Sequence, residues 1–322
     1  MKQESLPGKA LVVGMGSIGL RHARILRELG WEVSAVSRRK VPEPLLYATV
    51  EEALGKESFA YVVVANETCR HGETVGRLWD AGFRGSLLVE KPLGGEIPGQ
   101  VIIEQFERFS VAYQLRFMEV LDRLRHVLGG QRLHAVQVSA GQFLPHWRPD
   151  RDHRETYSAR ADKGGGVLRD LSHELDYIQW LFGPVKKVVA LGGRVGDVTV
   201  DTDDCWSILM ETEKVPVLQL HLNYYDRPAR REIVVQKPGE TIRVDLVRQL
   251  FWRNEEMVEF AESRDEAYRA MHQAQFGEPR VRPCSFDEAR EVEWLIRAIQ
   301  DSARTGSWEC RAVSFDRGGS ES

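Results

Sequence analysis

Residues 11–19 read L-V-V-G-M-G-S-I-G and decide the fold of the first part of the chain. A short apolar run ends in Gly14, Gly16 and Gly19, and an amphipathic segment at 21–29 follows at once. In the order strand, Gly-x-Gly-x-x-Gly, helix, the first glycine permits a tight turn, the second lets backbone approach a phosphate and the third lets helix and strand pack closely. The helix N-terminus then offers free N–H groups and a partial positive charge to an anion. The stretch predicts a dinucleotide-binding turn, with a purely structural glycine turn as the alternative.

The composition of the 322 residues is that of an ordinary globular protein, with 42% hydrophobic and 29% charged residues, and the length suits two domains. A formal net charge of −4 argues against a nucleic-acid-binding surface, which needs a basic excess. No apolar run approaches the roughly 20 residues of a membrane span, and the first residues lack the apolar core of a secretory signal. The four cysteines are too far apart for a close-spaced metal motif. We therefore expect a cytoplasmic protein with reduced thiols and no metal, and neither nucleic acid nor membrane as a partner.

The first third of the sequence alternates strand-like and helix-like segments, which predicts a parallel sheet with helices on both faces. We assign this doubly wound α/β domain of the Rossmann type to residues 1–115. Its predicted strands are 10–13, 33–36, 61–64, 87–89 and 111–113, and the helices between them include 74–81 and 99–109.

After Arg116 the strand-like runs cluster without intervening helices, which predicts a mostly antiparallel sheet with one face covered by helices. We assign this α+β domain to residues 116–322. Its predicted strands are 133–143, 185–191, 205–210, 217–222, 232–235, 241–246 and 249–252, and its helices are 166–182, 264–276 and 286–305.

The end of the second predicted strand, Ser37-Arg38-Arg39, bears on the choice of cofactor. In this fold an acidic residue here binds the ribose 2′-hydroxyl of NAD, whereas a basic residue accommodates the 2′-phosphate of NADP. Arginine suits a phosphate because its guanidinium offers paired and permanently charged donors. We predict NADP in preference to NAD, with a solvated basic loop as the alternative.

Two polar segments follow further strands of the first domain. Asn66 lies just past the third strand, where a cofactor passes the carboxyl edge of such a sheet, although a turn residue is the alternative. Lys91, in Glu90-Lys91-Pro92, can donate to a substrate oxygen or have a lowered pKa if it is partly desolvated. By itself an exposed surface lysine is the alternative. The Lys91–Pro92 bond is a candidate for the cis form.

A third polar segment follows Gly164-Gly165-Gly166 on a predicted helix. Asp170, His173 and Asp176 are three residues apart and so share one helix face. A histidine can exchange protons at neutral pH, and a neighbouring carboxylate can orient it, although a satisfied, half-buried histidine is the alternative. The run does not continue into His-Glu-x-x-His, which excludes a zinc-protease motif.

In this order and spacing, Gly14–Gly19, Glu90-Lys91-Pro92 and Gly164–Asp176 resemble the Gfo/Idh/MocA oxidoreductase family, and the resemblance covers nearly the whole chain. That family pairs an N-terminal Rossmann domain with a C-terminal domain on an open antiparallel sheet. Its lysine contacts nicotinamide and substrate, and an aspartate and a histidine complete the site. The resemblance therefore implies Lys91, Asp170 and His173 as catalytic residues. The aspartate and histidine are commonly four apart, and the spacing of three here turns the histidine by about 100° around a helix.

The segment at 143–159 is similar to a loop in family members from surface-sugar and nucleotide-sugar pathways. Trp147 offers a stacking face, and the arginines around it suit a phosphate or carboxylate, with an irregular basic loop as the alternative. We predict substrate contacts at Arg116, Trp147, Arg148 and Tyr157. We predict cofactor contacts at Gly14, Gly16, Ser17, Ile18, Gly19, Ser37, Arg38, Arg39, Ala65, Asn66, Glu90, Lys91 and Gln114.

These features predict a NAD(P)-dependent dehydrogenase that transfers a hydride between nicotinamide and a hydroxyl-bearing carbon of a sugar or sugar derivative. In the oxidative direction His173 would take the hydroxyl proton, Lys91 would stabilise the alkoxide, and Asp170 would orient one of them. Two alternatives stay open. One is a cofactor-binding redox sensor or scaffold without turnover, and the other is imine reduction or NAD-assisted hydrolysis on the same fold.

The open sheet of the second domain predicts a homodimer or homotetramer, because one of its faces would otherwise be exposed. We expect apolar strand residues to supply the contact, namely Trp206, Leu218, Leu220 and Leu222.

Overall fold

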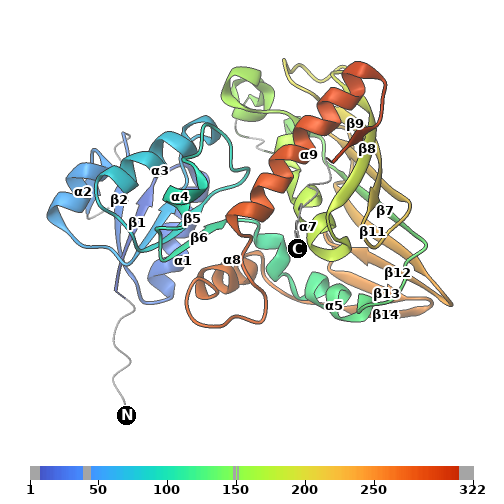
Figure 1. Cartoon of the computed structure of the whole chain (residues 1–322), viewed down its shortest axis with the longest axis horizontal. Coiled ribbons are helices and arrows are strands. Elements are labelled where there is room, and N and C mark those ends of the chain that lie inside the picture. The colour runs from blue at the N-terminus through green and yellow to red at the C-terminus, as the bar shows by residue number, and fades with distance from the viewer. Residues whose placement is uncertain (1–7, 39–44, 148–149, 151, 312–322) are drawn as a thin grey trace, which may run out of the picture.

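Two sheets organise the chain in the computed structural model, which describes residues 8–38, 45–147, 150 and 152–311. Figure 1 shows a six-stranded sheet flanked by helices beside a larger nine-stranded sheet, with the long helix α9 (Phe286–Thr305) running along the second part where it faces the first. Within the described ranges, no helix combines the length and apolarity that a membrane crossing requires.

The first sheet is parallel throughout, in the order β3-β2-β1-β4-β5-β6, as the alternating sequence predicts. Its central strands are buried along their length, which explains their unbroken Val and Leu runs. The strands are β1 (Lys9–Val13), β2 (Glu32–Val36), β3 (Leu46–Tyr47), β4 (Tyr61–Val64), β5 (Ser86–Val89) and β6 (Arg108–Val111). The helices are α1 (Ser17–Glu28), α2 (Val50–Lys56), α3 (His71–Asp80) and α4 (Gln100–Ile103).

The helix predicted at 99–109 is much shorter than expected, because α4 ends at Ile103. By Glu107 the backbone N–H already donates to the carbonyl of Arg84, 2.7 Å away, so the chain has joined the sheet edge. The last strand accordingly lies at Arg108–Val111 rather than at 111–113.

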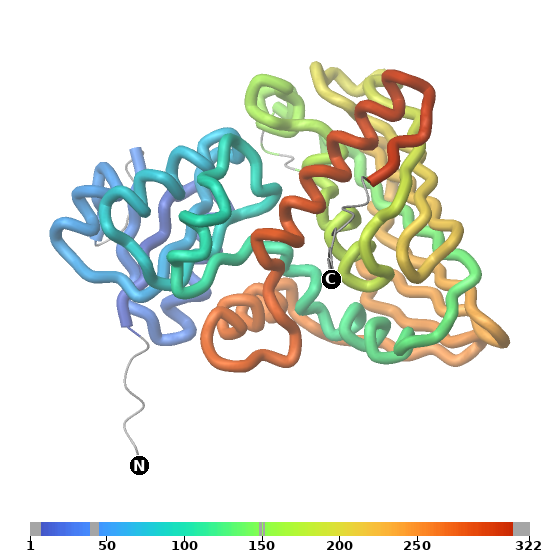
Figure 2. The backbone as a smooth tube through the Cα atoms, viewed as in Figure 1, coloured from blue at the N-terminus to red at the C-terminus, as the bar shows by residue number. Residues whose placement is uncertain are grey.

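Helix α8 (Arg264–Gln273) packs against the first sheet although it follows the strands of the second in sequence. Its apolar side chains Ala267, Tyr268 and Met271 share a core with Val12 of β1 and Ile25 of α1. Figure 2 shows this orange segment lying under the blue and cyan part of the trace. One face of the nucleotide-binding part is therefore completed by a helix from the other end of the chain.

The second sheet has the order β14-β13-β12-β11-β7-β10-β9-β8-β15, and only the β7–β10 pair is parallel among the strands described. This confirms the predicted mostly antiparallel sheet. Its strands are β7 (Ala135–Gly141), β8 (Val185–Gly193), β9 (Cys205–Thr212), β10 (Leu218–Asn223), β11 (Arg230–Lys237), β12 (Glu240–Asp245), β13 (Leu250–Arg253), β14 (Glu256–Glu259) and β15 (Glu309–Cys310). The helices of this part are α5 (Glu119–Leu128), α6 (Val167–Asp170), α7 (Ser172–Phe182) and α9.

The strands of the second sheet alternate buried and exposed residues, which leaves one face open to solvent. The four residues expected to meet a partner, Trp206, Leu218, Leu220 and Leu222, point the other way, because each is at most 4% exposed. The open face instead carries Leu191, Leu209 and Val217. The prediction of these contact residues was wrong, because it chose the buried face of the sheet, and neighbouring positions along each strand lie on opposite faces.

The helix predicted at 166–182 is interrupted, which corrects the argument that Asp170 and His173 share one helix face. Leu171 leaves the helical conformation, with φ −97° and ψ 28°, between α6 and α7. A tertiary contact sets the start of α6, since the carboxylate of Asp203 accepts from the backbone N–H of Leu168 at 2.9 Å. The pattern of residues within 166–182 could not predict this contact, because Asp203 lies outside that segment.

Candidate functional site

The glycine turn between β1 and α1 shows the close packing that its spacing predicts at Gly14 and Gly19. Gly14 has φ +97°, and a Cβ there would lie 2.6 Å from the backbone nitrogen of Asn66. A Cβ on Gly19 would lie 1.8 Å from the carbonyl oxygen of Gly14. A Cβ on Gly16 would meet nothing within 4 Å. Gly14 and Gly19 thus serve close backbone packing, whereas Gly16 borders open space at the N-terminus of α1.

The basic segment after β2 lies beside this turn, because Val36 pairs with Val13 and its carbonyl accepts from the N–H of Gly14 at 2.9 Å. Arg38 is exposed here, and its charge contributes to the lowered pKa of Glu73, whose main cause is a hydrogen bond from Arg70. Arg39 lies outside the described residues.

Asn66 lies past the end of β4 and places one unpaired atom at the same sheet edge. Its Nδ2 donates to Thr74 Oγ1 at 2.7 Å, while its buried Oδ1 has no hydrogen-bond partner among the described residues. His71 begins α3, and burial lowers its pKa. An unpaired buried oxygen costs free energy, so Asn66 Oδ1 is a position where a ligand donor would be stabilising.

Lys91 reaches from the end of β5 into the second part of the chain, where its Nζ donates to the backbone oxygen of Asp170 at 2.7 Å. The Lys91–Pro92 bond is cis, the form for which it was a candidate. Burial lowers the pKa of Lys91, and the charges of Asp170, Glu90 and Glu174 offset part of that shift. The ammonium is thus placed between the two sheets with carboxylates around it.

Asp170 is 6% exposed and uses only half of its carboxylate within the protein. Its Oδ2 accepts from the hydroxyl of Tyr224 at 2.6 Å, and its Oδ1 is buried without a partner among the described residues. Sequence reasoning missed Tyr224, because a tyrosine directly after a strand carries no signal of a distant carboxylate partner.

His173, at the start of α7, is 5% exposed, and its Nδ1 has no hydrogen-bond partner in the described chain. The ring packs edge-on against Tyr113, with centroids 5.5 Å apart. Burial lowers the pKa of His173 well below 6.5, and the charges of Lys91, Arg231 and Arg264 lower it further. The imidazole is therefore neutral at neutral pH and able to accept a proton.

Asp176 and Arg116 form a separate, saturated pair. Both side chains are 2% exposed, and Arg116 Nη2 lies 2.6 Å from Asp176 Oδ1. Arg116 Nη1 also reaches Glu288, at 2.9 Å, in the first turn of α9. The donors of Arg116 are thus directed at two carboxylates, and the geometry favours a structural role over the predicted substrate contact.

A second buried pair, Glu174 and Arg231, borders the catalytic candidates and was missed by sequence reasoning. Arg231 Nε lies 2.8 Å from Glu174 Oε1, and the glutamate is fully buried. Burial raises the pKa of Glu174 and the charge of Arg231 lowers it in part. The sequence gives no sign that Arg231 pairs with Glu174, because β11 and α7 are far apart along the chain and only the folded structure brings them together.

The predicted sugar-binding loop surrounds a cavity of about 120 Å³ that includes both Trp147 and Tyr157. His153 joins them, with a buried Nε2 that has no partner among the described residues. The Trp147 ring also packs edge-on against Tyr224, the residue that donates to Asp170, at 5.5 Å between centroids. Arg148 lies outside the described residues. The remaining lining residues are Leu144, Thr156 and Ser158.

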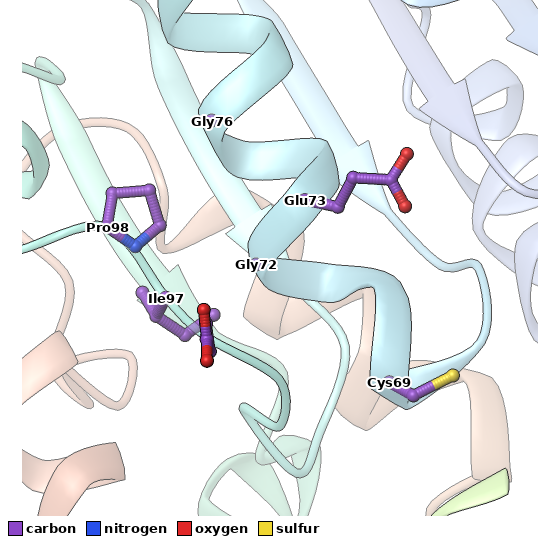
Figure 3. A pocket seen from close by; sticks show the side chains of 7 residues that line it. Cys69, Gly72, Glu73, Gly76, Ile97 and Pro98 are labelled. Carbon is purple, nitrogen blue, oxygen red and sulfur yellow. The ribbon is translucent and has the colours of Figure 1, made fainter.

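A larger hollow of about 580 Å³ lies between α3 and the segment at 96–98 (Figure 3). Its lining includes Cys69, Glu73 and Pro98 but none of Lys91, Asp170 and His173. It is a surface feature beside the nucleotide-binding part, and the chemistry-bearing side chains lie elsewhere.

Comparisons with known proteins agree with this architecture. Residues 122–241 match the family model of the GFO/IDH/MocA C-terminal domain. An uncharacterized oxidoreductase of Synechocystis sp. (strain ATCC 27184 / PCC 6803 / Kazusa) is 26% identical over 150 residues. That match spans 45% of this chain and 40% of the length of the relative.

Solved structures show the same fold at low identity. GenD2 from gentamicin A biosynthesis, in complex with NAD, has a TM-score of 0.77 at 19% identity, covering 95% of this chain and 96% of GenD2. The WlbA dehydrogenase from Bordetella pertussis, in complex with NADH and UDP-GlcNAcA, has a TM-score of 0.76 at 18% identity, covering 95% of this chain and 99% of WlbA. The myo-inositol 2-dehydrogenase from Lactobacillus plantarum has a TM-score of 0.72 at 16% identity, covering 94% of this chain and 98% of the dehydrogenase. Residues 122–241 thus match the C-terminal domain of the GFO/IDH/MocA family, and the chain as a whole shares the two-sheet fold of these dehydrogenases.

Proposed function

We propose that the protein is a NAD(P)-dependent oxidoreductase that transfers a hydride between nicotinamide and a hydroxyl-bearing carbon of a sugar or sugar derivative. The observation that carries the proposal is the junction of Lys91 with Asp170 and its neighbour His173, where two buried polar atoms lack partners among the residues that the structure describes. Native proteins rarely leave such atoms unpaired, so a bound ligand is the natural partner.

The glycine turn fits a dinucleotide pyrophosphate, because the open space beside Gly16 adjoins the N-terminus of α1. Gly14, Gly16, Ser17, Ile18 and Gly19 would hold the pyrophosphate. Asn66 and Glu90 would border the nicotinamide half. Arg38 supports NADP in preference to NAD, since an exposed arginine at the end of β2 can pair with a 2′-phosphate.

When bound, the nicotinamide supplies the hydride chemistry, and the side chains supply placement and proton handling. Lys91 Nζ donates to the reacting oxygen and stabilises negative charge on it. His173 accepts the hydroxyl proton on its neutral imidazole. The Asp170 carbonyl orients Lys91, and its carboxylate, held by Tyr224, keeps negative charge beside the ammonium. Of the two residues that Asp170 was expected to orient, Lys91 contacts it, whereas Nδ1 of His173 lacks a partner in the described chain.

The cavity beside Asp170 supports a sugar-type substrate. Trp147 and Tyr157 present aromatic faces, which favour sugar rings and bases, and His153 Nε2 adds an unpaired polar atom. Among the structural neighbours, WlbA was solved with UDP-GlcNAcA, and another neighbour is a myo-inositol dehydrogenase. These compounds are the first substrates to test.

The first experiment is a fluorescence titration with NADPH and NADH, read through energy transfer from the eight tryptophans. We expect tight binding with a preference for NADPH. Gly16→Val fills the open space and should weaken binding by about a hundredfold, a loss of order 3 kcal/mol. Gly55→Val, at another glycine with open space, is the matched control. A preference for NADH would overturn the phosphate assignment, and absence of binding would overturn the proposal.

The second experiment measures nicotinamide absorbance with UDP-N-acetylglucosamine, its uronate and myo-inositol, in both directions. Turnover of a hydroxyl compound would support the dehydrogenase. Tight cofactor binding without turnover across a broad sugar panel would instead favour the redox sensor or scaffold, which stays the alternative.

We also propose that the open face of the second sheet pairs with a second copy of the chain to form a homodimer or homotetramer. The exposed Leu191, Leu209 and Val217 support this, being between 47% and 79% exposed. Light scattering should report a multiple of 36.7 kDa, and Leu209→Glu should shift it toward the monomer. A monomeric wild-type protein would contradict this proposal.

A further inference from the structure

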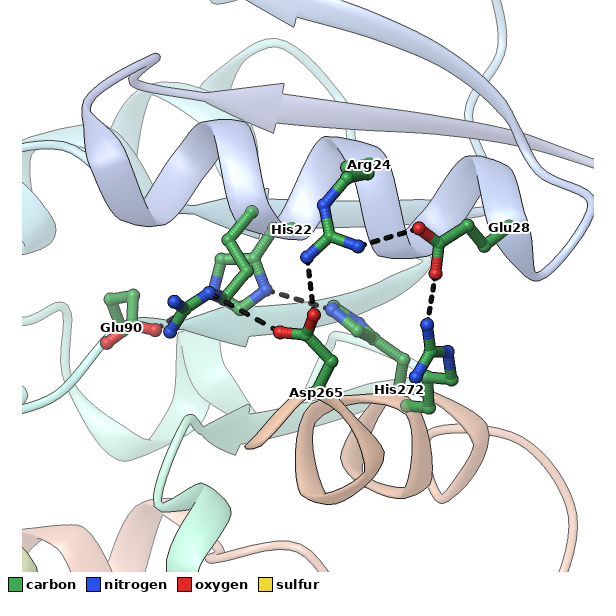
Figure 4. A network of polar contacts seen from close by, with 8 residues as sticks. His22, Arg24, Glu28, Glu90, Asp265 and His272 are labelled. Atoms are coloured by element: carbon green, nitrogen blue, oxygen red, sulfur yellow. Dashed lines mark hydrogen bonds and ion pairs between the residues drawn. The ribbon is translucent and has the colours of Figure 1, made fainter. Parts of the chain in front are cut away.

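A chain of four buried polar side chains runs from the core under α8 to the segment that carries Lys91, and Figure 4 shows three of them, His272, His22 and Glu90. Tyr61 Oη lies 2.9 Å from His272 Nδ1, and His272 Nε2 lies 2.9 Å from His22 Nδ1. His22 Nε2 lies 2.9 Å from Glu90 Oε1. Each of the four side chains is at most 10% exposed. The mechanism above uses none of these groups except Glu90.

The carboxylate at one end sets the direction of every hydrogen bond in this chain. Glu90 accepts, so His22 Nε2 carries a proton and the neutral His22 accepts on Nδ1. His272 must then donate from Nε2 and accept on Nδ1, where the Tyr61 hydroxyl donates. The opposite direction for the bond between His22 and His272 needs a proton on both nitrogens of His22. Burial independently lowers the pKa of His272 well below 6.5.

The chain ends inside the protein rather than at solvent. Tyr61 is fully buried, and burial raises the pKa of its hydroxyl well above 10.0. A buried phenol that holds its proton cannot exchange it with water during turnover. The four groups are therefore arranged to hold atoms in place and not to conduct protons.

Glu90 links these hydrogen bonds to Lys91. Its second oxygen, Oε2, accepts from the backbone N–H of Lys91 at 3.0 Å, and Lys91 Nζ donates to Asp170. Four consecutive contacts thus join His272 of α8 to Asp170.

Ion pairs on the surface hold α8 against α1. Asp265 lies 2.7 Å from Arg24, and Arg269 pairs with Glu28 (Figure 4). Together with the shared apolar core, they fix where His272 sits. The position of a helix from the C-terminal half is thereby linked to a residue of the N-terminal sheet.

We propose that His272 and His22 are positioning residues, which hold the Glu90 carboxylate and through it the backbone and ammonium of Lys91. This inference rests on the proposed function, because it assigns Lys91 to the reaction. According to this proposal, α8 helps to position Lys91, which follows a strand of the first sheet.

The first test is nuclear magnetic resonance of the full-length protein with isotope-labelled histidine, which distinguishes the two neutral tautomers and the doubly protonated ring. We expect both His22 and His272 to carry their proton on Nε2 at neutral pH. A proton on Nδ1 of either ring would overturn the chain direction.

The second test compares His272→Leu with His272→Gln. Leucine removes both hydrogen bonds, whereas glutamine keeps an N–H donor at the position of Nε2 and spares His22. The probe is trinitrobenzenesulfonate, and the readout is the labelling rate of Lys91 relative to the exposed Lys56, determined by mass spectrometry. We expect His272→Leu to raise this ratio about fivefold and His272→Gln to keep it within about twofold.

Equal labelling in both variants would overturn the positioning role. If His272→Leu does not fold, the wild-type tautomers and Tyr61→Phe, which removes a single hydroxyl, carry the same test. A twofold or smaller change for Tyr61→Phe together with Nδ1-protonated rings would then overturn the proposal. Titration with NADPH and NADH runs in parallel, so a protein that binds neither cofactor but shows the labelling contrast contradicts the proposed function alone.

Discussion

His173 and His272 are both buried histidines whose pKa lies well below 6.5, yet their surroundings are opposite. Both nitrogens of His272 have partners, one on β4 and one on α1. His173 Nδ1 has none in the described chain, and Asp170 Oδ1 nearby is also unpaired. The contrast separates groups that the fold uses for its own order from groups that it holds ready for a ligand.

The same contrast extends to the cations. Arg116 directs its guanidinium at Asp176 and Glu288, both within 2.9 Å of it. Among the described residues, the Lys91 ammonium donates to a backbone oxygen, with carboxylates close enough to influence its pKa. Saturated ion pairs indicate structure, and underused charges indicate function. The four predictions below use this distinction.

The largest effect is expected at Lys91. Lys91→Met should lower turnover about a thousandfold, because the reacting oxygen loses its charged donor, while the cofactor dissociation constant changes less than about threefold. Steady-state kinetics with a substrate from the sugar panel and NADPH titration measure the two quantities. Lys56→Met is the matched control at an exposed lysine. Unimpaired turnover in Lys91→Met would remove Lys91 from the mechanism.

Arg116→Leu tests the saturated ion pair with Asp176 and should lower the stability of the protein. It leaves Asp176 buried and unpaired, which should lower the free energy of unfolding by about 3 to 5 kcal/mol. Arg304→Leu, which removes an exposed pair with Asp301, should cost less than about 1 kcal/mol in the same urea titration. A double variant that also replaces Asp176 by Leu should recover part of the loss. Similar losses for Arg116 and Arg304 would contradict the structural role.

The two histidines should respond differently to the same replacement. His272→Leu leaves His22 Nδ1 and the Tyr61 hydroxyl without partners, so we expect a loss of about 2 kcal/mol in the free energy of unfolding. His173→Leu removes an unpaired nitrogen, so stability should change by less than about 1 kcal/mol while turnover falls at least about tenfold. Urea unfolding and kinetics on both variants make the comparison. Equal stability losses would erase it.

The smallest effect concerns pH. A histidine whose folded pKa lies below its unfolded value binds protons more readily in the unfolded chain, so stability falls as pH drops below about 6.5. The slope is up to about 1.4 kcal/mol per pH unit for each such group. Glu174 and Asp176 have raised pKa values and act with the opposite sign, but equally in wild type and variant. His272→Gln should therefore show a shallower decline between about pH 6.5 and about pH 5.5. Identical slopes would mean that His272 is not held neutral.

Local pattern was sufficient for much of the fold. The alternation of apolar runs predicted the parallel sheet, and α9 spans the predicted residues 286–305. Its ends are local, because Ser285 and Glu288 form a capping box and Gly306 ends the helix in the left-handed conformation. Gly14 and Gly19 likewise follow from spacing, since their turn is built from adjacent residues.

The site depended on contacts between distant segments. Asp203 binds the start of α6, and the partners of Asp170, Glu174 and His22 come from strands and helices far along the chain. Sequence alone also placed Trp206 and Leu218 on the wrong face of the second sheet, because alternation shows that two faces differ but not which one the helices cover.

By itself the sequence determined most of the elements, the glycine turn and the residue types that carry chemistry, because these depend on periodicity and on neighbours within a few residues. Only the tertiary structure decided which polar groups are saturated and which are left unpaired. That distinction depends on which side chains meet across the two sheets and α8, and hydrogen bonding is settled by those meetings rather than by residue type.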